Sequence, residues 1–251
     1  MKIYLVSKTV LNSPLVEQFI EDENTKWRRD DSASSNEEIV ELSGRVCYMS
    51  FGESQSPRNN EEYIRNLIKM GHESVLEHAC WTFIVTGVTR AFTHQLVRHR
   101  VGFSYSQLSQ QYHDESEAKF IPPIELNRKS KAYSNWKEQA RFSLDNYKET
   151  IAKMFNGRKL SDIDKEERRQ IRSVARSILP NCIETKIAVT ANARAIRHFL
   201  KIRGVIEGDL EMRYFSSKLL NIFKKDSPHL FQDIHVIEKH FDGHPILRVE
   251  E

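Results

Sequence analysis

The chain contains little cysteine and carries little net charge. Its 251 residues include three cysteines, Cys47, Cys80 and Cys182, and none of them forms a Cys-x-x-Cys pair. An odd number of cysteines without metal-ligand spacing argues against a cysteine metal site and favours reduced thiols. The formal net charge is +3, which is too small to indicate a general attraction to nucleic acid. A cationic binding site must therefore come from local clustering.

Long apolar runs are also absent from the sequence. The opening Met-Lys-Ile-Tyr-Leu-Val-Ser has too short an apolar stretch for a signal peptide, and no stretch approaches the ~18 apolar residues of a membrane span. We therefore expect a cytoplasmic protein with no membrane partner. The length is sufficient for a sizeable core, and we expect residues 1–251 to form a single domain.

Hydrophobic periodicity predicts helices between strands that are far apart in the sequence. The predicted strands cover 3–6, 81–88 and 183–190, and the predicted helices cover 12–21, 36–47, 59–70, 133–155, 164–178, 192–203 and 208–224, with a further short helix capped by Thr89 and running into Arg98. The polar residues 22–35 are expected to be loop. Residues 113–131 include Pro122-Pro123 and form an internal connecting segment, with one short extended piece at Phe120-Ile121. This order predicts an α+β fold, a mixed α/β-type sheet with flanking helices, whose strand pairing stays open.

The densest group of polar and cationic residues runs from Arg98 to Tyr112. Arg98-His99-Arg100 is followed by Val-Gly-Phe-Ser-Tyr-Ser-Gln-Leu and then Ser109. Arginine pairs bidentately with phosphate, histidine can donate to a phosphate or a ring oxygen, and Ser or Gln can fix orientation. The segment therefore suits a phosphorylated ligand that also carries a polar ring.

Two later helices carry further cations. The first has Arg168, Arg172 and Arg176 in one stripe opposite Ile171, Val174 and Ile178. Asp164 and Glu166 can neutralise the upstream part, so a solvated face is the favoured interpretation for Arg168 and Arg172. Arg176 lies beyond them against apolar neighbours, and it suits either a fixed anion or a salt bridge to another helix.

The second cationic helix begins at Asn192, which can cap it. Ala195, Phe199 and Ile202 can pack, Arg194 and His198 share a face at i, i+4, and Arg203 stands at the exit. A lone histidine on such a helix is usually structural, and basic residues near a helix C-terminus gain from the macrodipole. By itself, this helix is only a weak candidate site.

Gly71-His-Glu-Ser-Val-Leu-Glu-His78 raises the possibility of a metal site, because His and Glu are common ligands. However, His72 and His78 are six residues apart, and the segment contains no His-Glu-x-x-His pattern. Capping and hydrogen bonding at a sheet edge explain these residues more simply. We therefore expect no metal.

Taken together, these segments resemble the flavin-dependent thymidylate synthases, whose signature is Arg-His-Arg followed after seven or eight residues by Ser. Here eight residues, 101–108, intervene. The resemblance extends to GHESVLEH from 71, HQLVRHRVGFSYSQLSQQY from 94, ARSILPN from 175 and NARAIRHFLKIR from 192. It implies a homotetramer with FAD at subunit interfaces, which converts dUMP to dTMP with 5,10-methylenetetrahydrofolate as carbon donor and NADPH as reductant, and which has no nucleic-acid partner.

The resemblance also implies roles for individual residues. FAD would be bound by His72, Ser74, Glu77, Arg98, His99, Arg100, Gln107, Asn192, Arg194 and His198, and dUMP by Gln95, Arg98, Gln107, Ser109, Gln110, Gln111, Arg176 and Arg203. Arg203 would face the uracil ring and act catalytically, by stabilising negative charge that develops on the pyrimidine. Ser109 would orient dUMP rather than attack it.

Three positions depart from the family pattern. Gln111 stands where many members have an arginine that helps neutralise the nucleotide phosphate, Gln107 where some have glutamate, and Glu207 where a flavin-side histidine is often found. On generic physics, a nucleotide- or RNA-binding module that uses the arginines without catalysis ranks second, and a metal-dependent hydrolase third. Both alternatives predict no flavin.

Overall fold

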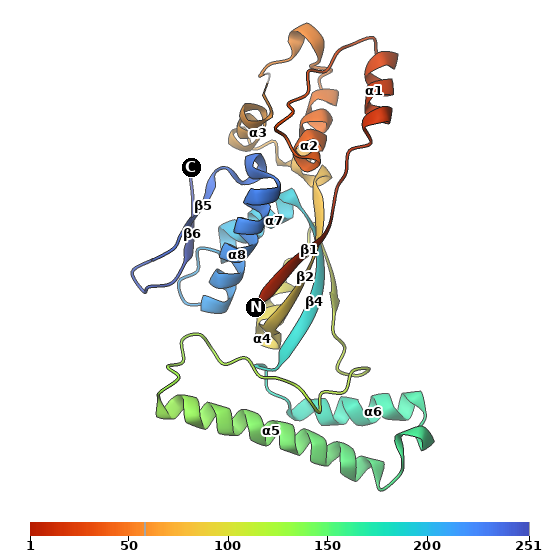
Figure 1. Cartoon of the computed structure of the whole chain (residues 1–251), viewed down its shortest axis with the longest axis vertical. Coiled ribbons are helices and arrows are strands. Elements are labelled where there is room, and N and C mark those ends of the chain that lie inside the picture. The colour runs from red at the N-terminus through yellow and green to blue at the C-terminus, as the bar shows by residue number, and fades with distance from the viewer. Residues whose placement is uncertain (58, 251) are drawn as a thin grey trace. The chain divides into compact units, whose positions relative to one another are not determined.

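The computed structural model describes residues 1–57 and 59–250 and combines helices with strands, as the sequence predicts (Figure 1). One sheet has the strand order β1-β2-β4-β3, formed by Lys2–Lys8, Cys80–Thr89, Glu184–Asn192 and Phe103–Gln107 respectively. Strands β2 and β4 are neighbours in the sheet, although a long and mainly helical stretch of the sequence lies between them. The sheet is therefore assembled from distant segments, which confirms that expectation.

Two compact units divide the chain. Unit 1 comprises Met1–Lys2, Val85–Arg98 and Tyr105–Ala188, and unit 2 comprises Ile3–Ile84, His99–Ser104 and Val189–Glu251. Strands β2, β3 and β4 each contribute residues to both units, because the unit boundaries fall inside or next to these strands.

Unit 1 contains the helices that lie between β2 and β4 in the sequence. These are α4 (Arg90–Leu96), α5 (Lys131–Phe155), α6 (Lys165–Ala175) and the 3-10 turns η3 (Leu160–Asp162) and η4 (Arg176–Ile178). Helices α5 and α6 lie side by side (Figure 1). The predicted cap is confirmed, since the Thr89 hydroxyl accepts a hydrogen bond from the Phe92 amide at 2.9 Å. The connecting segment has no regular element before α5 except an isolated bridge between Phe120 and Ile183.

Unit 2 contains the N-terminal helices and the C-terminal quarter of the chain. Its elements are α1 (Ser13–Asp22), α2 (Ser35–Val46), η1 (Gly52–Ser54), α3 (Asn60–Lys69), η2 (Glu73–His78), α7 (Ala193–Arg203), α8 (Leu210–Asp226), η5 (Pro228–Phe231) and the antiparallel hairpin of β5 (Ile234–Ile237) and β6 (Ile246–Val249). Its core is rich in aromatic rings: Trp81 lies 4.9 Å from Phe223, and Phe199 lies 5.7 Å from Phe215, between ring centroids. This packing fixes one face of α7 and leaves the other for polar residues.

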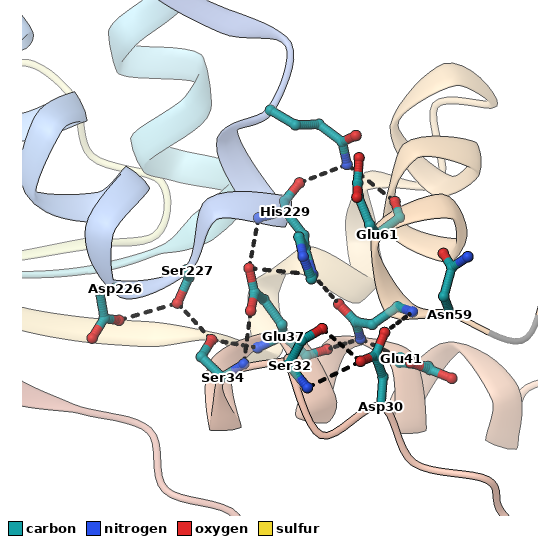
Figure 2. A network of polar contacts seen from close by, with 12 residues as sticks. Asp30, Ser32, Ser34, Glu37, Glu41, Asn59, Glu61, Asp226, Ser227 and His229 are labelled. Carbon is teal, nitrogen blue, oxygen red and sulfur yellow. Dashed lines mark hydrogen bonds and ion pairs between the residues drawn. The ribbon is translucent and has the colours of Figure 1, made fainter.

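A network of polar contacts joins α2, α3 and η5 within unit 2 (Figure 2). The buried Glu37 carboxylate accepts hydrogen bonds from the Ser34 amide at 2.7 Å and the His229 amide at 2.6 Å. The His229 ring contacts the Asn60 amide oxygen at 2.9 Å, and the Asn60 amide nitrogen donates to Glu41 at 2.8 Å. Because buried polar groups are costly when unpaired, these bonds make the helix positions mutually dependent.

Some details differ from the sequence-based expectations. Strands β3, β5 and β6 and the 3-10 turn η2 were not predicted, because each is too short to show a clear periodicity. The expected helix 164–178 is α-helical only to Ala175, and Val174 and Ile178 are 50% and 40% exposed rather than packed. Ile202 was also wrongly assigned to the core, since it is 42% exposed. Periodicity identified these residues as apolar but could not show whether a neighbouring element covers them.

Candidate functional site

A pocket of about 260 Å³ lies at the start of α7 in unit 2. Its lining residues come from η2, the loop after the Arg-His-Arg signature, the end of β4 and the first turns of α7: Glu73, Glu77, Val101, Gly102, Asn192, Arg194, Ala195 and His198. The sequence predicted that Arg194 and His198 share a helix face, and both side chains do line this pocket. The pocket therefore brings together residues from four segments of the sequence.

The geometry of this pocket depends on Asn192 and Gly102. Asn192 is the last residue of β4, and its side-chain oxygen caps α7 by accepting from the Ala195 amide at 2.9 Å, as predicted. Its backbone amide donates to the Gly102 carbonyl at 3.2 Å. Gly102 has a φ of +73°, and a Cβ built there would lie 2.8 Å from both the Ala195 Cβ and the Asn192 Nδ2. Only glycine therefore allows the signature loop to approach the start of α7 this closely.

Arg194 lines the pocket together with two carboxylates, those of Glu73 and Glu77. Its guanidinium pairs with the Glu77 carboxylate at 2.6 Å and with Glu73 at 3.5 Å, and the hydrogen bond to Glu77 raises the pKa of Arg194. Arg194 also lies in the first turn of an eleven-residue helix, where backbone amides and the macrodipole favour an anion. This donor set suits a phosphate-bearing ligand that competes with the two carboxylates for the arginine.

At the other end of α7, Arg203 contacts the histidine of the signature. Its Nε donates to His99 Nε2 at 2.9 Å. Burial, followed by the charges of Arg203 and His198, lowers the pKa of His99. His99 is therefore neutral at pH 7 and carries its hydrogen on Nδ1, and its ring packs 5.0 Å from that of Phe199. This contact fixes the orientation of the Arg203 guanidinium.

Unit 1 contains a second group of cations, around Arg90 and Arg176. Burial lowers the pKa of Arg90, the nearby charge of Arg176 lowers it further, and Glu115 opposes both effects. Burial in turn raises the pKa of the Glu115 carboxyl. Two partly buried guanidiniums of like charge favour an anion between or beside them.

Arg90 was missed at the sequence level. It is the first residue of α4, where the positive end of the helix macrodipole disfavours a cation. An arginine at a predicted first helical position, directly after the Thr89 cap, was the signal that could have identified it.

The end of the signature segment is attached to α6. The Gln111 amide nitrogen donates to Ser173 at 2.8 Å, and Arg169 donates to the Gln111 amide oxygen at 3.3 Å. Arg172 donates to the Tyr112 carbonyl at 2.7 Å. Arg172 is partly exposed, and a backbone carbonyl from a distant segment also binds it, which the interpretation as a solvated face did not include. Glu166 pairs with Arg169 at 3.3 Å, rather than with the Arg168 and Arg172 predicted for it.

The two units hold different subsets of the predicted site residues. Unit 2 contains His72, Ser74, Glu77, His99, Arg100, Asn192, Arg194, His198 and Arg203, and unit 1 contains Gln95, Arg98, Gln107, Ser109, Gln110, Gln111 and Arg176. Of the first group, five residues are not among those that line the α7 pocket: His72, Ser74, His99, Arg100 and Arg203. In the second, the Gln107 amide donates to the hydroxyls of Thr93 and Thr185 at 3.0 and 3.3 Å, and Gln110 is 6% exposed. Glu207, one of the three departures, contacts the His240 ring at 3.3 Å.

Two general features of the described residues bear on the site. Within 1–57 and 59–250, no group of three or more His, Cys, Asp or Glu side chains is arranged to hold a metal ion. Over the same residues, no helix is long and apolar enough to cross a membrane.

Comparison with known proteins identifies the family. A family model described as thymidylate synthase complementing protein (Thy1) matches residues 31–229. A flavin-dependent thymidylate synthase of Corynebacterium aurimucosum is 33% identical over 94% of this chain and 92% of its own length. Those of Corynebacterium diphtheriae and of Mycobacterium sp. (strain JLS) are 38% identical over 82% of both chains and 35% identical over 94% and 91%. The family resemblance that the signature indicates is therefore confirmed over most of the chain, and the chain belongs to the flavin-dependent thymidylate synthase family.

Proposed function

We propose that this protein is an enzyme that makes dTMP by reductive methylation of dUMP, with 5,10-methylenetetrahydrofolate as carbon donor and NADPH as reductant through FAD. Its relatives are named as flavin-dependent thymidylate synthases. The observation that carries the proposal is the α7 pocket, where an arginine in the first turn of the helix, a capping asparagine and a histidine surround a glycine-lined hollow. The three unpaired cysteines suit a cytoplasmic location.

The α7 pocket has the chemistry expected for binding FAD. Arg194 and the first turn of α7 would bind phosphate oxygens, His198 can donate a hydrogen bond, and Gly102 lets the signature loop form the adjoining wall of the pocket. When bound, FAD supplies the hydride chemistry that no side chain can provide. The protein contributes position and electrostatics.

The arginines of unit 1 suit the phosphate of dUMP. Arg90 and Arg176 supply two guanidiniums, and the hydroxyl of Ser109 and the amide of Gln110 can hydrogen-bond to a sugar or a polar ring. Burial of Gln110 favours a fixed orientation over a mobile surface contact.

In this proposal, Arg203 acts on the uracil ring. Held by His99 through its Nε, the guanidinium keeps one orientation, and it stabilises negative charge on the pyrimidine as carbon and hydride are added. His99 is a positioning residue for Arg203 in this step, because it acts through the arginine.

We further propose that the enzyme is a homotetramer with FAD at subunit interfaces. A volume of about 260 Å³ is below the roughly 300–1,000 Å³ of sites that enclose a drug-sized ligand, and FAD is larger than such ligands. One chain therefore provides walls for part of the cofactor, and a neighbouring subunit would complete the site.

An anaerobic absorbance experiment tests the proposed function. The purified protein is mixed with FAD, then with NADPH, and finally with dUMP and methylenetetrahydrofolate. We expect flavin bands that bleach with NADPH and return as dTMP forms, because electrons pass from nicotinamide to flavin to the new methyl group. A protein that neither binds nor reduces flavin would contradict the proposal and would favour a nucleotide- or RNA-binding module, whose affinity should fall steeply with salt.

A further inference from the structure

Gln111 connects the signature segment to one face of α6 through both atoms of its amide. The amide nitrogen donates to Ser173, and the amide oxygen accepts from Arg169 Nε. A neutral side chain in this position adds no charge of its own. It does, however, determine where the charge of Arg169 is held, because Nε is bound and the torsions of the side chain are thereby restricted.

Arg169 lies on the same side of α6 as the other residues that contact the signature segment. Arg169 and Ser173 are one helical turn apart, and so are Arg172 and Arg176. Arg172 donates to the Tyr112 carbonyl, and the Arg169 guanidinium lies 5.6 Å from the centroid of the Tyr112 ring. This face therefore directs Arg169 and Arg172 towards residues 111 and 112.

Two other arginines, one in the helix and one before it, differ from Arg169 in their contacts. Arg168 donates only weakly to the Asp164 carbonyl, at 3.4 Å, within its own helix. Arg158, in the loop before the helix, is paired at 2.6 Å with Glu167. Arg169 has a partly exposed acidic partner, Glu166 at 3.3 Å, so an incoming anion can compete for it in solvent.

We propose that Arg169, held by Gln111, is a phosphate-binding residue of the nucleotide site. This inference rests on the proposed function, and it adds Arg169 to Arg90 and Arg176 as a third cation for the phosphate. A nucleotide monophosphate carries close to two negative charges at neutral pH and offers three oxygens, which suits more than two guanidiniums. Gln111 is the positioning residue, and Arg169 makes the contact.

The test compares binding of dUMP with binding of deoxyuridine, which lacks the phosphate, to the full-length protein loaded with FAD. Calorimetric titration of Arg169→Gln should give a dUMP affinity weaker by about tenfold or more and an unchanged deoxyuridine affinity. Arg168→Gln is the matched control from the same helix and should bind both ligands as the unsubstituted protein does.

A second pair of variants separates positioning from charge. Gln111→Ala should weaken dUMP binding by releasing Arg169, and Gln111→Arg combined with Arg169→Gln should restore it by supplying the cation from position 111. Arg169→Lys keeps the charge and should retain an intermediate affinity if Arg169→Gln folds poorly.

Three results are decisive. Equal losses for dUMP and deoxyuridine, or no loss for either, would overturn the inference and leave Arg169 with a structural role. An unchanged dUMP affinity in Gln111→Ala would overturn the positioning role of Gln111. Failure of the unsubstituted protein to bind FAD or dUMP would instead refute the proposed function.

Discussion

At the scale of single residues, the contact between Arg203 and His99 determines a protonation state. His99 Nε2 can accept from Arg203 only while the ring is neutral, and burial together with the charges of Arg203 and His198 lowers its pKa below the ordinary 6.5. Two further rings that pack against it, those of Phe103 and Phe199, are apolar. Acidification therefore places a second positive charge beside Arg203 and removes the acceptor.

We predict an acid limb in the activity of the enzyme that disappears in His99→Gln. Because the pKa of His99 is lowered, kcat for dTMP formation should fall only below about pH 6.5. Glutamine retains an oxygen that can accept from Arg203, but it does not titrate in this range. The measurement is a profile of kcat against pH for both proteins at saturating dUMP and folate. An identical acid limb in the variant would show that another group titrates.

The sequence indicated most of the candidate site residues discussed here, but not all of them. Composition and motif density identified the signature segment, and i, i+4 spacing identified Arg194 and His198. Arg90 was missed because its importance comes from Arg176, which is far away in the chain and near in the fold. The contact of Arg172 was not predicted either, since its partner is a backbone carbonyl, which no side-chain pattern reveals.

At the scale of elements, the α7 pocket depends on the close approach of the signature loop to the helix. Gly102 makes this possible through its positive φ and its missing side chain. Sequence patterns predicted the helices well, because amphipathic periodicity and caps such as Thr89 and Asn192 are local signals. They missed β3, β5 and β6, because a strand of four or five residues depends on the strand paired with it more than on its own residues.

Gly102→Ala should weaken flavin binding and lower thermal stability. Alanine at a positive φ costs about 1–2 kcal/mol, and its Cβ would also meet Ala195 and Asn192 at 2.8 Å. Gly157→Ala is the matched control, because Gly157 has a φ of +76° but no atom lies within 4 Å of the place that an alanine methyl group would take. Melting temperature and FAD titration should show a larger stability loss for Gly102→Ala and a loss of flavin affinity in that variant alone. Similar behaviour of both variants would mean that strain, rather than the close approach, dominates.

At the scale of the whole molecule, buried polar groups hold segments from opposite ends of the sequence together. In the network of Figure 2, Glu37 of α2 accepts from the amide of His229, which lies in η5 near the end of the chain. Three arginines, Arg45, Arg197 and Arg213, are likewise buried and bind carboxylates and carbonyls. Such residues resemble functional arginines in the sequence, and only their burial distinguishes them.

Glu37→Gln should destabilise unit 2 without changing the chemistry of the site. One carboxylate oxygen would become an amide that faces the amide of Ser34 or His229, which leaves a buried donor unpaired at a cost of about 1–3 kcal/mol. Chemical denaturation measures the loss, and Glu62→Gln, at an exposed position on α3, serves as the control. A variant as stable as the control would indicate that water satisfies these donors.

The joints between strand and helix have a consequence for how the chain can change in length during evolution. Strand β2 ends at Thr89 and α4 begins at Arg90, and β4 ends at Asn192 and α7 begins at Ala193, so neither joint contains a spare loop residue. One inserted residue at the second joint would rotate the side chains of α7 by about 100° and turn Arg194 and His198 away from their pocket. Insertions and deletions should therefore accumulate in segments such as 113–130 and be eliminated at these two joints, even where single substitutions are tolerated.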